Sequence, residues 1–329
     1  MQNTLETYFV APTGDKTDMK GAIEEKLREH GSCMLGCGEY YVSGIEMPEG
    51  STVMGLGYAS KLILLSDIES GYTVKMSSYC TVKDLAVLGS PERLPRPTEL
   101  GNRHGIAFVG TATHENYSNQ PRHSIINSCF ISSFSGGGIT CVDTGYHTSS
   151  SITASDCHIY SCGAAINIPH FSEYHEFTNM LCTDSLYGCI NNGGNNVFVN
   201  CGFNSNTTGF VIDNRDGQSI NNSHGSAVGC TFNHTDKNRG IGILLIGVNC
   251  GYVFTGCQVF YSKIVCDGCD RINFNAINYG RDQEIILKNS KLTLFQNSFF
   301  KISPTLTKDE TSEVKFINCF TAEGEPISF

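Results

Sequence analysis

Acidic side chains stand at the ends of several short apolar segments in the second half of the chain. Asp213 closes the segment 210–213, Asp267 closes the segment 264–267, and Asp216 lies in the loop directly after Asp213. Two carboxyl groups that flank a glycosidic bond can cleave it, one as an acid and the other as a base or a nucleophile. We therefore predict that Asp213 acts with Asp267 or with Asp216 as a catalytic carboxylate pair.

The segment ends and loops on this side of the chain are rich in histidines, acids and aromatic residues. Such a mixture suits sugar binding, because a ring covers the apolar face of a pyranose while polar groups bind its hydroxyls. The alternatives are a solvated edge of the fold and, for His175, a position that packs inward. The side chains predicted to bind substrate are Asp143, His147, His170, Glu173, Tyr174, His175, Asn191, Arg215 and His224.

A short phrase recurs along the chain and predicts the elements that position these residues. It reads apolar-x-apolar, then usually Asn or Gly, then Cys, then often an aromatic or aliphatic residue. Its period of roughly 19 to 29 residues is typical of a solenoid, and each copy resembles a short strand that a turn follows. The sequence therefore predicts a parallel β-helix. The copies centre on Cys129, Cys201, Cys230, Cys257 and Cys319, with weaker ones at Cys157, Cys182, Ala276 and Ser298.

The coil repeat converts sequence positions into distances, because equivalent residues of successive coils lie about 4.8 Å apart. Asp213 and Asp267 are two coils apart in our alignment, hence roughly 9 to 10 Å. Inverting glycosidases separate their carboxyl groups by roughly 6.5–9.5 Å. Asx turns at β-helix corners are the alternative explanation of this row of polar residues. The full row reads Asp143, Asn167 or Pro169, Asn191, Asp213, Gly247, Asp267 and Asn289.

The first sixty residues carry a different pattern. The segment 13–18, Thr-Gly-Asp-Lys-Thr-Asp, precedes a predicted helix at 19–30. The motifs that follow are Gly-Cys-Gly-Glu-Tyr-Tyr-Val at 36–42, Met-Pro-Glu-Gly-Ser-Thr-Val at 47–53 and Gly-Leu-Gly at 55–57. This order resembles the opening of the pectate-lyase-like superfamily, which includes polysaccharide lyases, glycoside hydrolases, epimerases and phage tailspikes. The resemblance implies a right-handed β-helix whose first coil is covered by the helix.

We therefore expect an all-β chain that forms a single-stranded right-handed parallel β-helix, a solenoid with a short N-terminal capping helix. Residues 1–38 are expected to form the capping segment and residues 39–329 the β-helix. The segment 91–122 interrupts the repeat with prolines and polar residues. Loops of this length in a compact domain are often functional, so we expect this one to flank a groove.

The chain contains sixteen cysteines, and their spacing suggests a use other than disulfides. The repeat cysteines recur at one strand position, so we expect them to stack inside the β-helix, where free Cys behaves as a small hydrophobic residue. Such free thiols favour a reducing compartment during folding. Cys266 and Cys269 form one CxxC pair, but a zinc site needs further ligands, and we expect no metal and no cofactor.

Composition narrows the classes of partner. The net charge of −10 argues against nucleic acid or an anionic membrane as the main partner. Residues 1–10 lack the basic and apolar regions of a secretory signal, and no apolar run approaches the roughly 18 residues of a membrane span. We expect a cytoplasmic or virion-associated location rather than secretion.

The leading functional hypothesis is a carbohydrate-active enzyme, a glycoside hydrolase that acts on a polysaccharide or an oligosaccharide by paired-carboxylate chemistry. It depends on the resemblance together with the acidic, aromatic and histidine-bearing edge. The alternative is a phage tail or appendage protein that binds or depolymerises surface glycans, for which a homotrimer would be expected. A polysaccharide lyase or epimerase is the third hypothesis.

Overall fold

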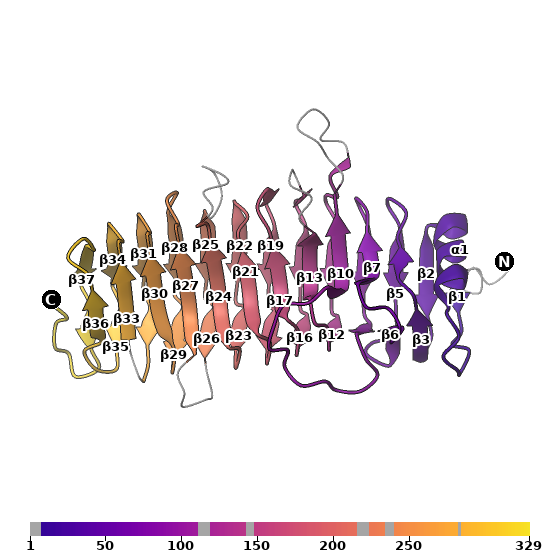
Figure 1. Ribbon diagram of the computed structural model, residues 1–329, viewed down its shortest axis with the longest axis horizontal. Coiled ribbons are helices and arrows are strands. Elements are labelled where there is room, and N and C mark those ends of the chain that lie inside the picture. The colour runs from indigo at the N-terminus through magenta and orange to yellow at the C-terminus, as the bar shows by residue number, and fades with distance from the viewer. Residues whose placement is uncertain (1–7, 111–118, 143–147, 216–223, 234–239, 282–283) are drawn as a thin grey trace.

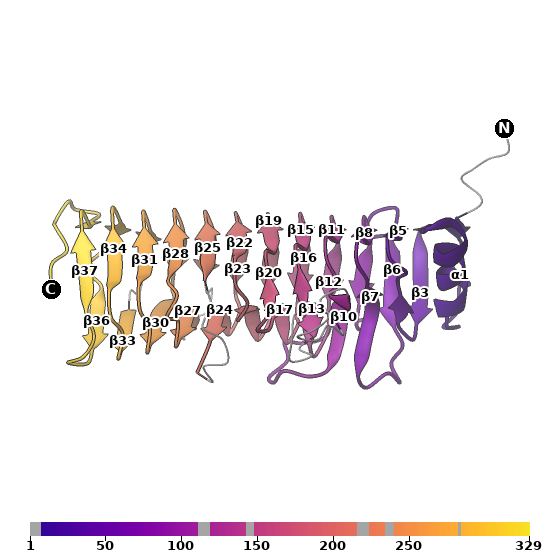
Figure 2. The ribbon, with the colours of Figure 1, turned by 90° about the horizontal axis from the view of Figure 1, so that it is seen from above.

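The protein is a right-handed parallel β-helix in the computed structural model (Figure 1). The structure describes residues 8–110, 119–142, 148–215, 224–233, 240–281 and 284–329. Each coil of the chain contributes one strand to each of three long parallel sheets, and the strands of each sheet follow one another along the whole length (Figure 2). The fold class expected from the repeat and from the resemblance is confirmed.

Sheet 1 contains the apolar segment that precedes each corner residue of the repeat phrase. Its strands alternate between inward and outward side chains, as expected for a half-buried strand. The strands of sheet 1, in spatial order, are β1 (Phe9–Val10), β2 (Ser32–Leu35), β5 (Thr52–Met54), β8 (Thr81–Lys83), β11 (Ile125–Asn127), β15 (Thr153–Ser155), β19 (Glu176–Thr178), β22 (Asn196–Val199), β25 (Gly225–Val228), β28 (Tyr252–Thr255), β31 (Ile272–Asn275), β34 (Thr293–Gln296) and β37 (Val314–Ile317).

Sheet 2 follows sheet 1 after a tight corner. The strands of sheet 2 are β3 (Gly38–Val42), β6 (Ser60–Leu64), β9 (Ala86–Leu88), β12 (Phe130–Ser132), β16 (His158–Tyr160), β20 (Leu181–Thr183), β23 (Gly202–Asn204), β26 (Thr231–Asn233), β29 (Gln258–Phe260), β32 (Asn278–Tyr279), β35 (Phe299–Phe300) and β38 (Phe320–Thr321).

Sheet 3 closes each coil, and a short pair of strands, β14 (Ser149–Ser150) and β18 (Ser172–Glu173), lies at the corner between sheets 3 and 1. The strands of sheet 3 are β4 (Ile45–Glu46), β7 (Gly71–Met76), β10 (Arg103–Val109), β13 (Gly137–Val142), β17 (Ala164–Ile168), β21 (Tyr187–Asn191), β24 (Thr208–Asp213), β27 (Ile241–Ile246), β30 (Lys263–Asp267), β33 (Glu284–Lys288) and β36 (Thr305–Lys308).

The corner between sheets 1 and 2 explains the Asn or Gly of the repeat phrase. From the corner between β8 and β9 onward, each coil turns there on one residue with a positive φ, for example 53° at Asn200 and 65° at Gly229. Gly adopts this left-handed conformation freely, and Asn and Asp adopt it more readily than other residues do. The residue after the corner points inward, which places Cys201 and Cys230 inside the coil.

The cysteine prediction is confirmed. All sixteen cysteines are free, fourteen of them are buried, Cys37 is exposed and Cys250 is partly exposed. The buried thiols donate weakly to main-chain carbonyls of the neighbouring coil, as Cys201 does to Phe177 at 3.3 Å. The same interior holds stacked aromatic rings, and the centroids of Phe274 and Phe295 are 4.6 Å apart.

Helix α1 (Lys20–His30) covers the N-terminal end of the β-helix (Figure 1). Ile23 and Leu27, one helical turn apart, are both buried against the first coil, and the helix ends at Gly31 with a φ of 67°. A solenoid needs such a cover because its terminal coil would otherwise expose the core. Among the described residues α1 is the single helix, and it is too short to cross a membrane.

Candidate functional site

Asp213 and Asp267 lie in one column at the ends of strands β24 and β30. The strand register pairs Asp213 with Ile246 and Ile246 with Asp267. The two acids are therefore two coils apart, as the sequence alignment predicted. Both side chains are partly exposed on the outside of the β-helix, at the corner between sheets 3 and 1.

Other members of the predicted row are displaced from this column. Ile246 lies between the two acids and Lys288 follows Asp267, so Gly247 and Asn289 each lie one residue beyond it. Asn191 is fully buried, and its Oδ1 accepts a hydrogen bond from Asn196 Nδ2 at 2.9 Å. The prediction that Asn191 binds substrate is therefore wrong, because its side chain faces the interior.

His175 is also an interior residue. Of the two possibilities considered for it, substrate binding and a side chain that packs inward, the structure supports the second. Its side chain is 1% exposed. Nδ1 accepts a hydrogen bond from the Ile152 N–H at 3.1 Å, and Nε2 lies 3.2 Å from Ser149 Oγ. Burial lowers the pKa of His175 to about 3, so the ring is neutral and Nε2 carries the proton that is donated to Ser149.

The Asp213 carboxylate is held by Arg215. The Arg215 Nε donates to Asp213 Oδ1 at 2.9 Å, and the Arg215 main-chain N–H donates to the same oxygen at 3.2 Å. These hydrogen bonds, chiefly from the Arg215 side chain, lower the pKa of Asp213, and His170 contributes electrostatically. An ionised carboxylate suits a base or a nucleophile better than an acid. The Asp213 N–H also donates to Asn192 Oδ1 at 2.8 Å.

The remaining predicted residues divide into two groups. Glu173, Tyr174 and His224 lie at the same corner as Asp213, and Tyr174 is 61% exposed. Asp143, His147 and Asp216 lie outside the described residues. The structure therefore brings the Asp213 and Asp267 carboxylates, Arg215 and His170 to one corner, which we call the Asp213 rim.

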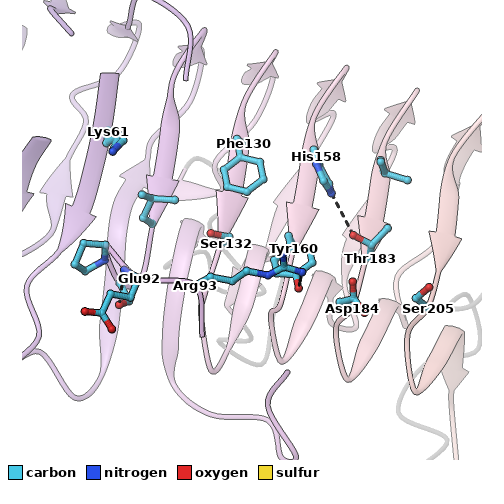
Figure 3. A pocket seen from close by; sticks show the side chains of 14 residues that line it. Lys61, Glu92, Arg93, Phe130, Ser132, His158, Tyr160, Thr183, Asp184 and Ser205 are labelled. Atoms are coloured by element: carbon cyan, nitrogen blue, oxygen red, sulfur yellow. Dashed lines mark hydrogen bonds between the residues drawn. The ribbon is translucent and has the colours of Figure 1, made fainter. Parts of the chain in front are cut away.

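A pocket that the sequence did not predict lies on the outer face of sheet 2 (Figure 3). Its volume is about 620 Å³, within the range of roughly 300–1,000 Å³ that small-molecule sites have. The lining includes Asp184, a residue to which our sequence analysis gave no role. The lining residues are Lys61, Leu88, Ser90, Pro91, Glu92, Arg93, Phe130, Ser132, His158, Tyr160, Leu181, Thr183, Asp184 and Ser205.

Residues 90–102 connect β9 to β10, and we call them the strap. The first four of them, residues 90–93, line one side of this pocket. In Figure 1 the strap runs below the strands, on the side opposite the Asp213 rim. The Arg93 guanidinium lies 4.1 Å from the centroid of the Tyr160 ring. Ser161 Oγ donates to the Leu94 carbonyl at 2.8 Å, and Arg96 pairs with Asp184 at 3.4 Å. Of the segment 91–122, which we expected to flank a groove, Pro91, Glu92 and Arg93 line this pocket.

No metal centre is formed by the part of the chain that the structure describes, because no three His, Cys, Asp or Glu side chains converge there. Cys266 and Cys269, the CxxC pair, are both buried within the β-helix.

Comparison with known proteins identifies the fold. No family model and no curated protein sequence matches the chain. Among solved structures, the A-module of mannuronan C-5 epimerase from Azotobacter vinelandii has 13% identity and a TM-score of 0.59, over 97% of this chain and 96% of that one. The catalytic domain of a GH87 α-1,3-glucanase in complex with nigerose has 12% identity and a TM-score of 0.61, over 97% of this chain.

The tailspike of Escherichia coli bacteriophage HK620, in complex with a hexasaccharide, has 12% identity and a TM-score of 0.56 over 97% of this chain. This chain spans 66% of the glucanase structure and 64% of the tailspike structure. All three comparison proteins are right-handed parallel β-helices, as the resemblance of the first sixty residues implied.

Proposed function

We propose that the protein is a carbohydrate-active enzyme, a glycoside hydrolase that cleaves a polysaccharide or an oligosaccharide at the Asp213 rim. The observation that carries this proposal is the column in which Asp213 and Asp267 stand two coils apart on the exposed corner. The comparison structures support the substrate class, since they include a glucanase in complex with nigerose and a tailspike in complex with a hexasaccharide.

The ion pair of Asp213 with Arg215 gives the two acids different surroundings, and we assign their roles on that basis. Asp213 is held ionised by Arg215, so it acts as the base that removes a proton from the attacking water. Asp267 acts as the acid that protonates the glycosidic oxygen. Two coil spacings of about 4.8 Å separate the residues, which leaves room for a water molecule and predicts inversion at the anomeric carbon.

The residues around the two acids supply substrate contacts in this proposal. Tyr174, with 61% of its surface exposed, can cover the apolar face of a sugar ring, while His170, Glu173 and His224 reach its hydroxyl groups. Ile246 lies between the acids in the column and excludes competing water from the floor of the site. If Asp216 takes the place of Asp267, a carboxyl separation of about 5–5.5 Å would indicate a retaining mechanism.

The second candidate is a phage appendage protein that binds or depolymerises glycans. It is supported by the tailspikes among the comparison structures, such as tailspike protein 2 of bacteriophage CBA120 (TM-score 0.53, 94% of this chain and 45% of that one). A homotrimer in sedimentation velocity would favour this candidate. A lyase or epimerase, the third candidate, is supported by the end-to-end match with the epimerase module.

The test is turnover of a panel of polysaccharides by purified protein. Release of reducing ends without ultraviolet-absorbing unsaturated product indicates hydrolysis, whereas unsaturated product indicates a lyase. Asp213→Asn should lower kcat by about 10³-fold, within the range that general acid–base catalysis contributes, and should leave the protein folded, as checked by circular dichroism.

The matched control is Asp156→Asn, the same change at an exposed residue of the corner between sheets 1 and 2. This variant should retain the activity of the wild type. Full activity in Asp213→Asn would remove the catalytic assignment, and equal losses in both variants would show that the effect is structural.

A further inference from the structure

Aromatic side chains form a track along the outer face of sheet 2. Phe130, His158 and Tyr160 line the pocket described above, and Tyr58 lies next to Phe130 outside the pocket lining. The ring centroids of Tyr58 and Phe130 are 5.8 Å apart, those of Phe130 and His158 are 5.3 Å apart, and those of His158 and Tyr160 are 6.2 Å apart. Phe130 and His158 occupy the same outward position of successive coils. The rings of Phe130 and His158 meet edge to face, with an interplanar angle of 78°, and so do those of His158 and Tyr160, with an angle of 82°. The track therefore offers a saccharide both ring faces and ring edges to contact.

The strap gives this track a second wall. Arg93 reaches from the strap to Tyr160, as Figure 3 shows, and Leu94 and Arg96 fix the strap to neighbouring coils. Pro91 and Leu88 add apolar surface on this side. A ligand on the track would therefore be enclosed between the strap and the rings, away from bulk water.

The charges of the lining cancel. Lys61 and Arg93 supply two positive charges, and Glu92 and Asp184 supply two negative ones. Lys61 pairs with Glu39 at 3.2 Å, and Asp184 pairs with Arg96 at 3.4 Å. His158 is held neutral, because burial lowers its pKa. The pocket therefore lacks the excess of positive charge that would select an acidic polysaccharide.

Hydroxyl groups complete the lining. Ser90, Ser132, Thr183 and Ser205 each place a group that can both donate and accept hydrogen bonds next to the apolar rings. His158 Nε2 lies 3.1 Å from Thr183 Oγ1, which orients that hydroxyl. Rings combined with neutral donors and acceptors match the two kinds of surface that an uncharged sugar presents.

We propose that the pocket under the strap is a second glycan-binding site, which takes a short segment of a neutral oligosaccharide and does not catalyse its cleavage. The site lies on sheet 2, whereas the Asp213 rim lies at the corner between sheets 3 and 1. This second site rests on the proposed function only for the class of its ligand, a carbohydrate. Its geometry involves none of the rim residues. Its consequence is that a long polymer can be held at sheet 2 while another part of it reaches the rim.

The test measures binding separately from cleavage by using Asp213→Asn protein in isothermal titration calorimetry. The probes are hexasaccharides of a neutral glucan and a neutral mannan, with a hexasaccharide of a polyuronate as the charged arm. At least one neutral probe should bind, and the polyuronate should bind at least about tenfold more weakly than it, a factor that corresponds to about 1.4 kcal/mol. Phe130→Ala should weaken binding of the neutral probe by about tenfold or more.

The matched control is Phe299→Ala, which removes a ring from the same outward column of sheet 2 but outside the pocket. It should leave binding unchanged. Leu181→Glu, at a residue 40% exposed in the pocket, provides a second variant should Phe130→Ala fail to fold, and it should also abolish binding.

Failure to bind either neutral probe would overturn the second site, as would equal effects of Phe130→Ala and Phe299→Ala. Tighter binding of the polyuronate would refute the assignment of a neutral ligand. If the wild type hydrolyses a glycan but Phe130→Ala does not weaken binding, the second site is refuted while the proposed function stands. Binding that depends on Phe130 in a protein without hydrolytic activity would refute the rim assignment alone.

Discussion

His175 makes a quantitative prediction about stability and pH. The ring is buried and neutral, and its pKa in the folded protein is lowered to about 3 by burial. In the unfolded chain a histidine has a pKa of about 6.5. Between these two values the unfolded chain binds a proton that the folded protein does not bind. The contribution of His175 to the free energy of unfolding is therefore fully present above pH 6.5. It is lost progressively as the pH falls from 6.5 toward 3.

The size of the effect follows from proton linkage. Within this window, one such group lowers the free energy of unfolding by about 1.4 kcal/mol for each pH unit. Between pH 7 and pH 5 the loss is about 2 kcal/mol, because the first half unit lies above the unfolded-state pKa. Asp213 and Asp309 also have lowered pKa values, but they remain ionised in this range and contribute little to the change.

The variant that isolates this contribution is His175→Asn, because the next coil already carries an asparagine in the same role. Asn196 Oδ1 accepts the His175 N–H at 2.9 Å, just as His175 Nδ1 accepts the Ile152 N–H at 3.1 Å. An asparagine at position 175 should preserve this acceptor and remove the titrating group. The assay is urea unfolding of both proteins at several pH values from 7 to 5.

We expect the wild type to lose about 2 kcal/mol more than His175→Asn over this range, whatever the difference between them at pH 7. Contributions from other titrating groups are common to both proteins and cancel in the comparison. The reasoning is refuted if the two pH profiles are parallel. It is equally refuted if the His175 ring, followed by NMR in the folded protein, titrates near pH 6.5.

Two further predictions concern the coil interior and its corners. A thiol-reactive reagent should modify Cys37 rapidly and Cys250 more slowly in the native protein, while the fourteen buried cysteines react after denaturation; fast reaction of more than two thiols would contradict the interior stack. Ala276 adopts a φ of 53° at the corner where Gly256 has 63°, so Ala276→Gly should raise the free energy of unfolding in urea by about 1 kcal/mol. Gly256→Ala should lower the free energy of unfolding by a similar amount. Changes of the opposite sign in the two variants would show that the corner residues are not strained.

The coil architecture could be predicted because its corner and its interior both restrict residue type. The left-handed conformation of the corner residue favours Asn or Gly, and the next residue must be small and apolar. Pairs such as Asn200-Cys201 and Gly229-Cys230 therefore identify a coil even where the flanking sequences differ. The same restriction put Asp213 and Asp267 in one column. The β-helix was therefore predictable from the part of the sequence that its geometry constrains most.

Whether an individual polar side chain points to the outer face or into the interior was not predictable in the same way. A shift of one residue along a strand moves a side chain from the outer face to the interior. His175 and Asn191 were assigned outward because they are polar, whereas the interior satisfies them with hydrogen bonds from Ile152 and Asn196. These partners lie in other coils or strands, and the sequence does not show which of them are in reach.

The sheet 2 pocket was missed for a different reason. Its aromatic track did leave a signal, since Phe130 and His158 directly follow the corner cysteines Cys129 and Cys157 and must point outward. The strap gives no comparable signal, because Arg93 reaches Tyr160 across 67 positions of sequence. A long loop can cross any of the three faces, and its path depends on contacts that form after the coils have stacked.

The stacking of coils also makes the length of this molecule adjustable in fixed steps. Arg271 and Leu292 occupy equivalent corners, with φ values of 59° and 52°, and each directly precedes a strand of sheet 1. Joining Arg271 to Thr293 would excise one complete turn, bring Phe254 against Phe295 in the aromatic stack, and shorten the fibre by about 4.8 Å. Related chains could gain or lose such turns. The length of the β-helix would then change while the structures at its two ends stay the same.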